Sequence, residues 1–161
     1  MRFWRVAAAH APVPCFDMTQ RIYLRSLVHR LTVTAISAAD SSPPVVLICP
    51  WIAWAMEIEE LERVEVFNVR TGRRLQAGIL FGWKGQFEAS SVFRQYLNVG
   101  DEVMVSSYMT VPAGDSAERT GTLVWAKGNR PLEIRRVTAR KVNRDPSYVA
   151  LPQRKESVVL A

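Results

Sequence analysis

The stretch from residue 64 to residue 81 constrains the fold most, because its pattern is that of two paired strands. Residues 64–69 alternate largely between apolar and polar side chains, and residues 74–81 form a second extended segment. Gly72 lies between the two segments, and glycine readily adopts the positive φ that tight turns require. The sequence therefore predicts a β-hairpin over this stretch.

Further strands are expected on both sides of the hairpin. Residues 24–34 are rich in β-branched residues, and residues 45–48 form a short apolar run that predicts a fully buried strand. Residues 103–108 and 122–126 have the same extended character. The fold class that we predict is mainly β.

Two short helices complete the expected domain. Pro50 suits a first helical position, and apolar residues then recur at helical spacing opposite four glutamates. We expect this apolar face to pack in the core, the alternative being that one tryptophan lines a pocket at a subunit boundary. A second helix is expected over residues 90–97. The apolar face of the first helix comprises Trp51, Trp54, Ala55, Ile58 and Leu61.

Length and composition indicate one domain with extensions. With 161 residues the chain can enclose one core, and we expect an N-terminal extension at 1–17, a domain at 18–130 and a basic extension at 131–161. No apolar run approaches the roughly 20 residues of a membrane span, so we expect a cytoplasmic protein without a membrane partner. The two cysteines, Cys15 and Cys49, fit no metal motif, and we expect no metal.

The net charge of +6 raises the question of nucleic-acid binding. From residue 131 onward there are seven basic and three acidic residues, so much of the charge lies in the tail. A basic end of this kind is usually a solvated extension. We therefore do not expect nucleic acid as a partner.

Three segments, in order and at consistent spacing, resemble the pyruvoyl-dependent aspartate 1-decarboxylase family. They are residues 29–34, residues 64–74 with Asn68 and Gly72, and residues 99–108 with Asp101. The resemblance implies a double-psi β-barrel of about six strands with short helices. It also implies a homotetramer whose active sites lie between subunits and bind a small molecule.

The resembled family makes its pyruvoyl group by cleaving a Gly-Ser bond, and this chain contains no Gly-Ser dipeptide. The expected place reads Ser41-Ser42-Pro43-Pro44. One alternative is cleavage between Ser41 and Ser42, which would convert Ser42 into a pyruvoyl group on Pro43. If this cleavage does not occur, we expect the chain to have no cofactor.

Other positions at which the resemblance implies catalytic groups have changed as well. The family's lysine corresponds to Leu27, its threonine and tyrosine to Ala77 and Gly78, and its asparagine to Ser90. The lost hydroxyls assist self-cleavage and protonation in the family. Such losses cost on the order of 10²-fold in rate each, so we expect little aspartate decarboxylation.

Two positions of the family's site are retained. Arg74 matches the arginine that holds the substrate carboxylate, and its planar fork suits bidentate recognition. His29 matches the histidine beside the cleavage loop and titrates near neutral pH. The structural alternatives are a solvated hairpin charge for Arg74 and a loop-bonding histidine for His29. Asp40 and Ser42 are further candidates for assisting catalysis.

The substitutions predict a more apolar pocket, lined by Arg74, Leu27, Phe67, Trp83, Ser90 and Phe93. We therefore hypothesise an enzyme of the cyclase, isomerase or lyase type, acting on a hydrophobic carbonyl- or carboxylate-bearing metabolite of specialised metabolism. A non-catalytic binding or scaffold protein is the second hypothesis. Aspartate decarboxylation after cleavage at Ser41-Ser42 is the third.

Overall fold

The computed structural model describes residues 20–38, 43–115, 117–139 and 157–159. Side chains are described from residue 20 to residue 138 within these ranges. The candidates Asp40 and Ser42, the Ser41-Ser42 bond, Cys15 and the extension at 1–17 lie outside the described residues.

The described chain is mainly β, which confirms the predicted fold class, and its arrangement is consistent with a β-barrel. One α-helix and one short 3₁₀-helix interrupt the strands. In chain order the elements are β1 (Gln20–Thr32), β2 (Ala35–Ile36), β3 (Val45–Ile48), α1 (Pro50–Met56), β4 (Arg63–Asn68), β5 (Arg74–Phe81), β6 (Phe87–Ala89), η1 (Ser91–Phe93), β7 (Glu102–Pro112), β8 (Arg119–Lys127), β9 (Arg130–Ala139) and β10 (Ser157–Val159).

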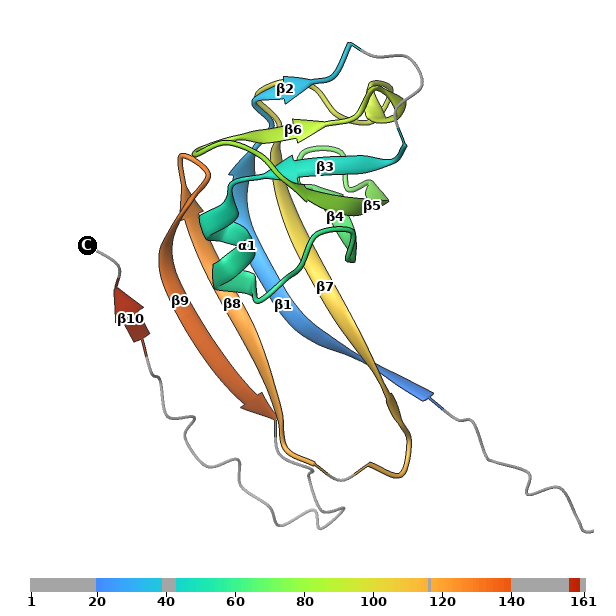
Figure 1. Cartoon of the computed structure of the whole chain (residues 1–161), viewed down its shortest axis with the longest axis vertical. Helices are drawn as coiled ribbons and strands as arrows, with labels where there is room; N and C mark the ends of the chain where they lie inside the picture. Colours follow the sequence, from blue (N-terminus) through green and yellow to red (C-terminus); the bar gives the residue numbers. More distant parts are fainter. Residues whose placement is uncertain (1–19, 39–42, 116, 140–156, 160–161) are drawn as a thin grey trace, which may run out of the picture.

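The strands form one sheet in the order β10-β9-β8-β1-β7-β4-β5-β3-β6-β2. The long strands β9, β8, β1 and β7 run side by side, while the shorter β3, β6 and β2 cross at one end (Figure 1). β1 pairs with β8 in parallel, as do β3 with β5 and β2 with β6. Parallel pairs require crossovers, so segments distant in sequence meet in the sheet.

The predicted hairpin is present as β4 and β5, which pair antiparallel from Arg63 opposite Gly78 to Phe67 opposite Arg74. β3 has the predicted bounds, although its burial alternates instead of being complete. The second predicted helix is reduced to the 3₁₀ turn η1. β9 was not predicted, and it pairs with β8 within the stretch expected to be a basic extension.

The predicted inner face of the first helix is wrong at Trp51, Trp54 and Leu61, which are exposed, whereas Ile58 is buried as predicted. α1 ends after seven residues, where Glu57 adopts a left-handed conformation with φ 57°. Its buried residues are Ile52, Ala53 and Met56. Trp51 and Trp54 are 41% and 65% exposed. The buried stripe is rotated because Ile52 and Met56, four residues apart, already fill the space against the sheet.

The core lies between α1 and the inner face of the sheet. Val124, Val28, Val105 and Val66 occupy the successive strands β8, β1, β7 and β4 of this face and are buried. Cys49 is also buried in this core as a free thiol, which agrees with its predicted role as a small apolar residue.

Candidate functional site

Arg74 begins β5 directly opposite Phe67 of β4. Its guanidinium carbon lies 5.8 Å from the centroid of the Phe67 ring, and Nη1 lies 3.4 Å from Oε1 of Glu65. The Arg74 side chain is 69% exposed. An exposed ion pair at this distance contributes little, whereas the ring limits how the guanidinium orients. The fork of Arg74 is therefore open to solvent and to an anionic ligand.

His29 lies on β1 beside Trp125 of β8, its partner in the parallel pairing. The two rings are stacked, with centroids 5.5 Å apart and planes inclined by 17°. Burial lowers the pKa of His29 below 6.5, the positive charge of Arg30 lowers it further, and Glu102 opposes them. The imidazole is therefore mainly neutral at pH 7 and can accept a proton.

A β-bulge follows His29. The pairing of β1 with β7 shifts between Val28 and Leu31, and Arg30 takes a positive φ of 64°. A residue other than glycine rarely adopts this conformation, and bulges turn neighbouring side chains to new directions. The bulge thus fixes the direction in which the His29 side chain points, and it places the charge of Arg30 next to the imidazole.

His29 and Arg74 share the outer face of the sheet. The bulge places His29 across from Met104 on β7, Met104 pairs with Phe67, and Phe67 pairs with Arg74. Three steps between neighbouring strands separate the backbones of His29 and Arg74 by about 14 Å along the sheet. One subunit therefore places both groups on one surface, with Met104 and Phe67 between them, and does not bring them into contact.

Leu27 lies on the same face, two residues before His29. It pairs with Leu123 of β8 and with Ser106 of β7. The Ser106 hydroxyl donates to the phenol oxygen of Tyr108 at 3.2 Å. Leu27, which stands where the resembled family has a lysine, is therefore an aliphatic side chain between an apolar neighbour and a neighbour with a hydroxyl group.

Ser90 and Gly78 meet the end of the loop that contains the expected cleavage position. The amide of Val45 donates to Oγ of Ser90 at 3.3 Å, and the amide of Gly78 donates to the Pro44 carbonyl at 2.9 Å. Ser90 is 2% exposed and Ala77 is buried. The Ser90 hydroxyl already bonds the backbone, and positions 77 and 78 add no side-chain donor. The described residues at this loop end thus do not provide the groups that the resemblance associates with a pyruvoyl site.

Trp83 and Phe93 lie apart from Arg74 and His29. Trp83 follows β5 at its far end and is 80% exposed. Phe93 is buried in the hydrophobic core. The outer face instead includes Trp125 and Met104, which are not among the residues predicted for the site. Their place depends on the pairing of β8 and β7 with β1, which no local pattern encodes.

Two features are absent from the described residues. These residues contain no group of three or more His, Cys, Asp and Glu side chains arranged to hold a metal ion. Among the same residues, no helix has the length and apolar character needed to cross a membrane.

Comparisons with known proteins agree on one family. A family model described as aspartate decarboxylase matches residues 18–132. An aspartate 1-decarboxylase of Bdellovibrio bacteriovorus is 27% identical over 121 residues, which are 75% of this chain and 96% of that protein. An aspartate 1-decarboxylase of Ralstonia nicotianae is 30% identical over 121 residues, covering 73% of this chain and 99% of that protein. The chain belongs to the aspartate decarboxylase family.

Proposed function

We propose that this chain is an enzyme that works without self-processing, on a hydrophobic metabolite bearing a carboxylate or a carbonyl group. The reaction type that we propose is a cyclisation, isomerisation or elimination in specialised metabolism. The observation that supports it is that Arg74 and His29 are retained on the outer face, whereas Leu27 on the same face carries no reactive group, and neither do Ala77 and Gly78 at the Pro44 end of the loop.

Each retained residue has a defined role in this proposal. Arg74 binds the carboxylate or carbonyl oxygen of the substrate through its exposed fork. Phe67, which pairs with Arg74, and Met104, which pairs with Phe67, offer apolar surface beside the guanidinium for the body of the substrate. Neutral His29 takes a proton from the carbon next to the carbonyl, and the proton returns to another atom of the product.

The separation of about 14 Å between His29 and Arg74 bears on where the site lies. A small metabolite is shorter than this separation between the two backbones. We propose that the chain is a homotetramer and that Arg74 of one subunit faces His29 of another. The outer face supports this, because it carries half-buried apolar side chains from neighbouring strands, namely Leu27, Phe67, Met104, Leu123 and Trp125.

Aspartate decarboxylation is the second candidate, and the names of the relatives favour it. It requires that the Ser42 hydroxyl attack the carbonyl of Ser41 to form an ester, and that β-elimination release the Ser41 carboxylate and leave a dehydroalanine at position 42. Water then hydrolyses the imine form of this residue to a pyruvoyl group on Pro43, with loss of ammonia. The surroundings argue against it, since Ser90 bonds the backbone and Gly78 has no side chain. A non-catalytic binding protein is the remaining candidate.

Proton transfer at a hydrophobic α-keto acid tests the proposal. We would incubate the purified chain with 4-methyl-2-oxopentanoate in deuterated buffer and follow the loss of its C3 proton signal by NMR. We expect faster exchange than without protein, and loss of that acceleration in His29→Gln and Arg74→Gln. Arg73→Gln is the matched control, because its guanidinium contacts Tyr96 and not Phe67.

Two results would contradict the proposal. Equal exchange in wild type, His29→Gln and Arg74→Gln would favour the non-catalytic candidate. Conversion of aspartate into β-alanine and carbon dioxide by the same preparation would favour the decarboxylase.

A further inference from the structure

A second surface, formed where two turns meet the start of α1, combines exposed tryptophans with cations. We call it the aromatic-basic tip and define it by Trp51, Trp83, Lys84, Lys127 and Arg130. All five side chains are exposed. They come from three places in the chain: the start of α1, the turn between β5 and β6, and the turn between β8 and β9.

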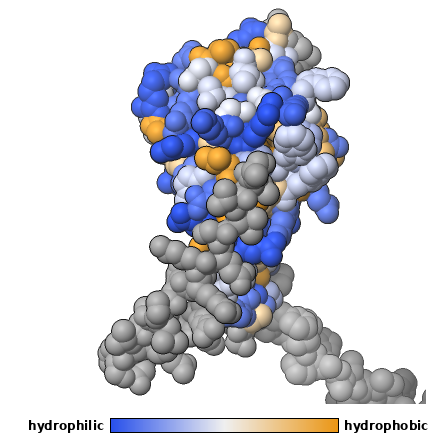
Figure 2. All heavy atoms as spheres, turned by 90° about the vertical axis from the view of Figure 1, so that its left-hand side faces the viewer, coloured by the Kyte–Doolittle hydropathy of each residue, from blue (hydrophilic) through white to orange (hydrophobic). Residues whose placement is uncertain are grey.

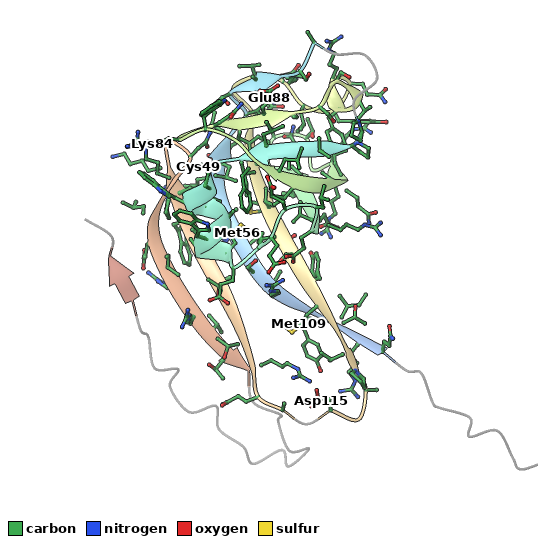
Figure 3. The ribbon with its side chains drawn as sticks, viewed as in Figure 1. Cys49, Met56, Lys84, Glu88, Met109 and Asp115 are labelled. Carbon is green, nitrogen blue, oxygen red and sulfur yellow. The ribbon has the colours of Figure 1, made fainter. Side chains whose placement is uncertain are left out.

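Contacts between these three segments hold the tip together. The Cys49 amide donates to the Gln86 carbonyl at 3.0 Å, which joins the start of α1 to the β5–β6 turn. The Asn129 side-chain amide donates to the Gly85 carbonyl at 3.0 Å, which adds the β8–β9 turn. Figure 3 shows Lys84 and Cys49 close together at one end of α1, whereas Met56 marks the other end.

The tip is cationic. Within the part of the chain that the structure describes, Lys84, Lys127 and Arg130 form no ion pair, and Nζ of Lys84 lies 4.7 Å from the centroid of the Trp51 ring. Two glutamates lie near the tip, where Glu60 accepts from the Phe81 amide and Glu88 accepts from the Gln86 side chain, both at 2.8 Å, which leaves the three cations unpaired among the described residues and in excess. Figure 2 views this side of the molecule and shows hydrophilic side chains interspersed with hydrophobic ones. Charge complementarity therefore selects an anionic partner.

We propose that the aromatic-basic tip docks on the headgroups of anionic lipids at a membrane surface. Trp83, which is 80% exposed on a turn, enters the interfacial region, where the amphipathic indole ring is favoured. Lys84, Lys127 and Arg130 pair with the lipid phosphates. This docking is peripheral and needs no membrane-spanning segment.

The arrangement favours a lipid surface over a nucleic-acid strand. Strand binding uses a series of free aromatic faces along a basic groove. At the tip, Lys84 covers one face of Trp51, and the cations lie on two adjacent turns. Such a cluster matches a surface of closely spaced headgroups better than an extended backbone.

Vesicle co-sedimentation of the full chain tests the proposal. One set of vesicles contains only phosphatidylcholine, and the other contains equal amounts of phosphatidylcholine and phosphatidylglycerol. We expect binding to the anionic vesicles alone, weakened by added salt and accompanied by a blue shift of tryptophan fluorescence. Each cation near an anionic surface changes affinity roughly 5-fold, so Lys84→Gln with Lys127→Gln lowers it about 25-fold.

Matched variants separate the tip from general charge. Arg63→Gln with Arg73→Gln removes the same charge from the β4–β5 hairpin and should lower the affinity much less. Trp83→Ala should remove most of the blue shift, whereas Val99→Ala, at another exposed apolar residue, should not. The proposal is overturned by equal binding to both kinds of vesicle, or by equal effects of the two double variants. It is also overturned if the tip variants weaken binding to an oligothymidylate strand, or change the sedimentation mass, without changing vesicle binding.

Discussion

The side-chain amide of Asn68 donates to Oδ2 of Asp101 at 2.8 Å, which ties the end of β4 to the residue just before β7. Oδ1 of Asn68 in turn accepts from the amides of Arg70 and Thr71, at 3.0 and 3.1 Å. Arg70 Nε and the Asn98 amide also donate to the Asp101 carboxylate, both at 2.9 Å. This network fixes the β4–β5 turn and thereby places Arg74 opposite Phe67.

The first prediction concerns the buried amide of that network. Asn68→Ala should lower the free energy of unfolding by about 2–3 kcal/mol, because it leaves two backbone amides and part of a carboxylate without partners. Urea denaturation measures the loss. Asn98→Ala is the control, since the network uses only the backbone amide of Asn98. Equal losses in the two variants would show that the side chain of Asn68 has no special role.

The second prediction concerns acid. The hydrogen bond from Arg70, the largest effect, lowers the pKa of Asp101 to about 2, with help from the Asn98 amide and Asn68 and against burial. The unfolded value is about 3.9, so the stabilisation by this carboxylate is complete above about pH 4 and is lost as the pH falls toward 2. Urea midpoints of wild type and Asp101→Asn should therefore differ at neutral pH and converge in acid. A pH-independent difference would contradict the prediction.

The third prediction concerns the proton affinity of His29. Arg30→Gln should raise the pKa of His29, and Glu102→Gln should lower it, because these are the charges that act on the ring. In Arg30→Gln the pKa should stay below 6.5, since burial is the largest cause. NMR titration of the imidazole Cε1 proton measures each value, and the spectrum of His29→Gln identifies the signal. No change in either variant would show that the two charges are screened from the ring.

The fourth prediction follows from the rotated face of α1. Ile52→Ala should lower the free energy of unfolding by about 2–5 kcal/mol, because it removes fully buried atoms. Trp54→Ala should cost less than about 1 kcal/mol, since the ring is 65% exposed. Thermal unfolding of both variants checks the order. A larger loss in Trp54→Ala would restore the tryptophan-rich inner face that the sequence predicts.

The sequence predicts the β4–β5 hairpin and β3 well because alternation and a turn glycine are local signals. It misleads at α1, where Trp51 and Trp54 have helical spacing but a helix of seven residues allows Ile52 and Met56 to face the sheet instead. It also misses β9, whose many charges resemble those of a solvated tail and which becomes a strand by pairing with β8.

The candidate site is predictable only in part. Arg74 and His29 were recognised through their family positions, and the structure places them on one face. Their neighbours Trp125 and Met104 could not be predicted from the sequence. The parallel pairing of β1 with β8 brings together residues that are far apart in the chain. The separation of His29 from Arg74 likewise depends on the strand order β1-β7-β4-β5, which is a property of the whole sheet.

The absence of self-processing is the central claim, and the intact mass of the purified chain tests it most directly. We expect a single species with the mass of the whole unbroken sequence, and no change after prolonged incubation or warming. Two fragments that divide between Ser41 and Ser42, with a pyruvoyl group at the start of the second, would contradict the account and establish the decarboxylase chemistry instead.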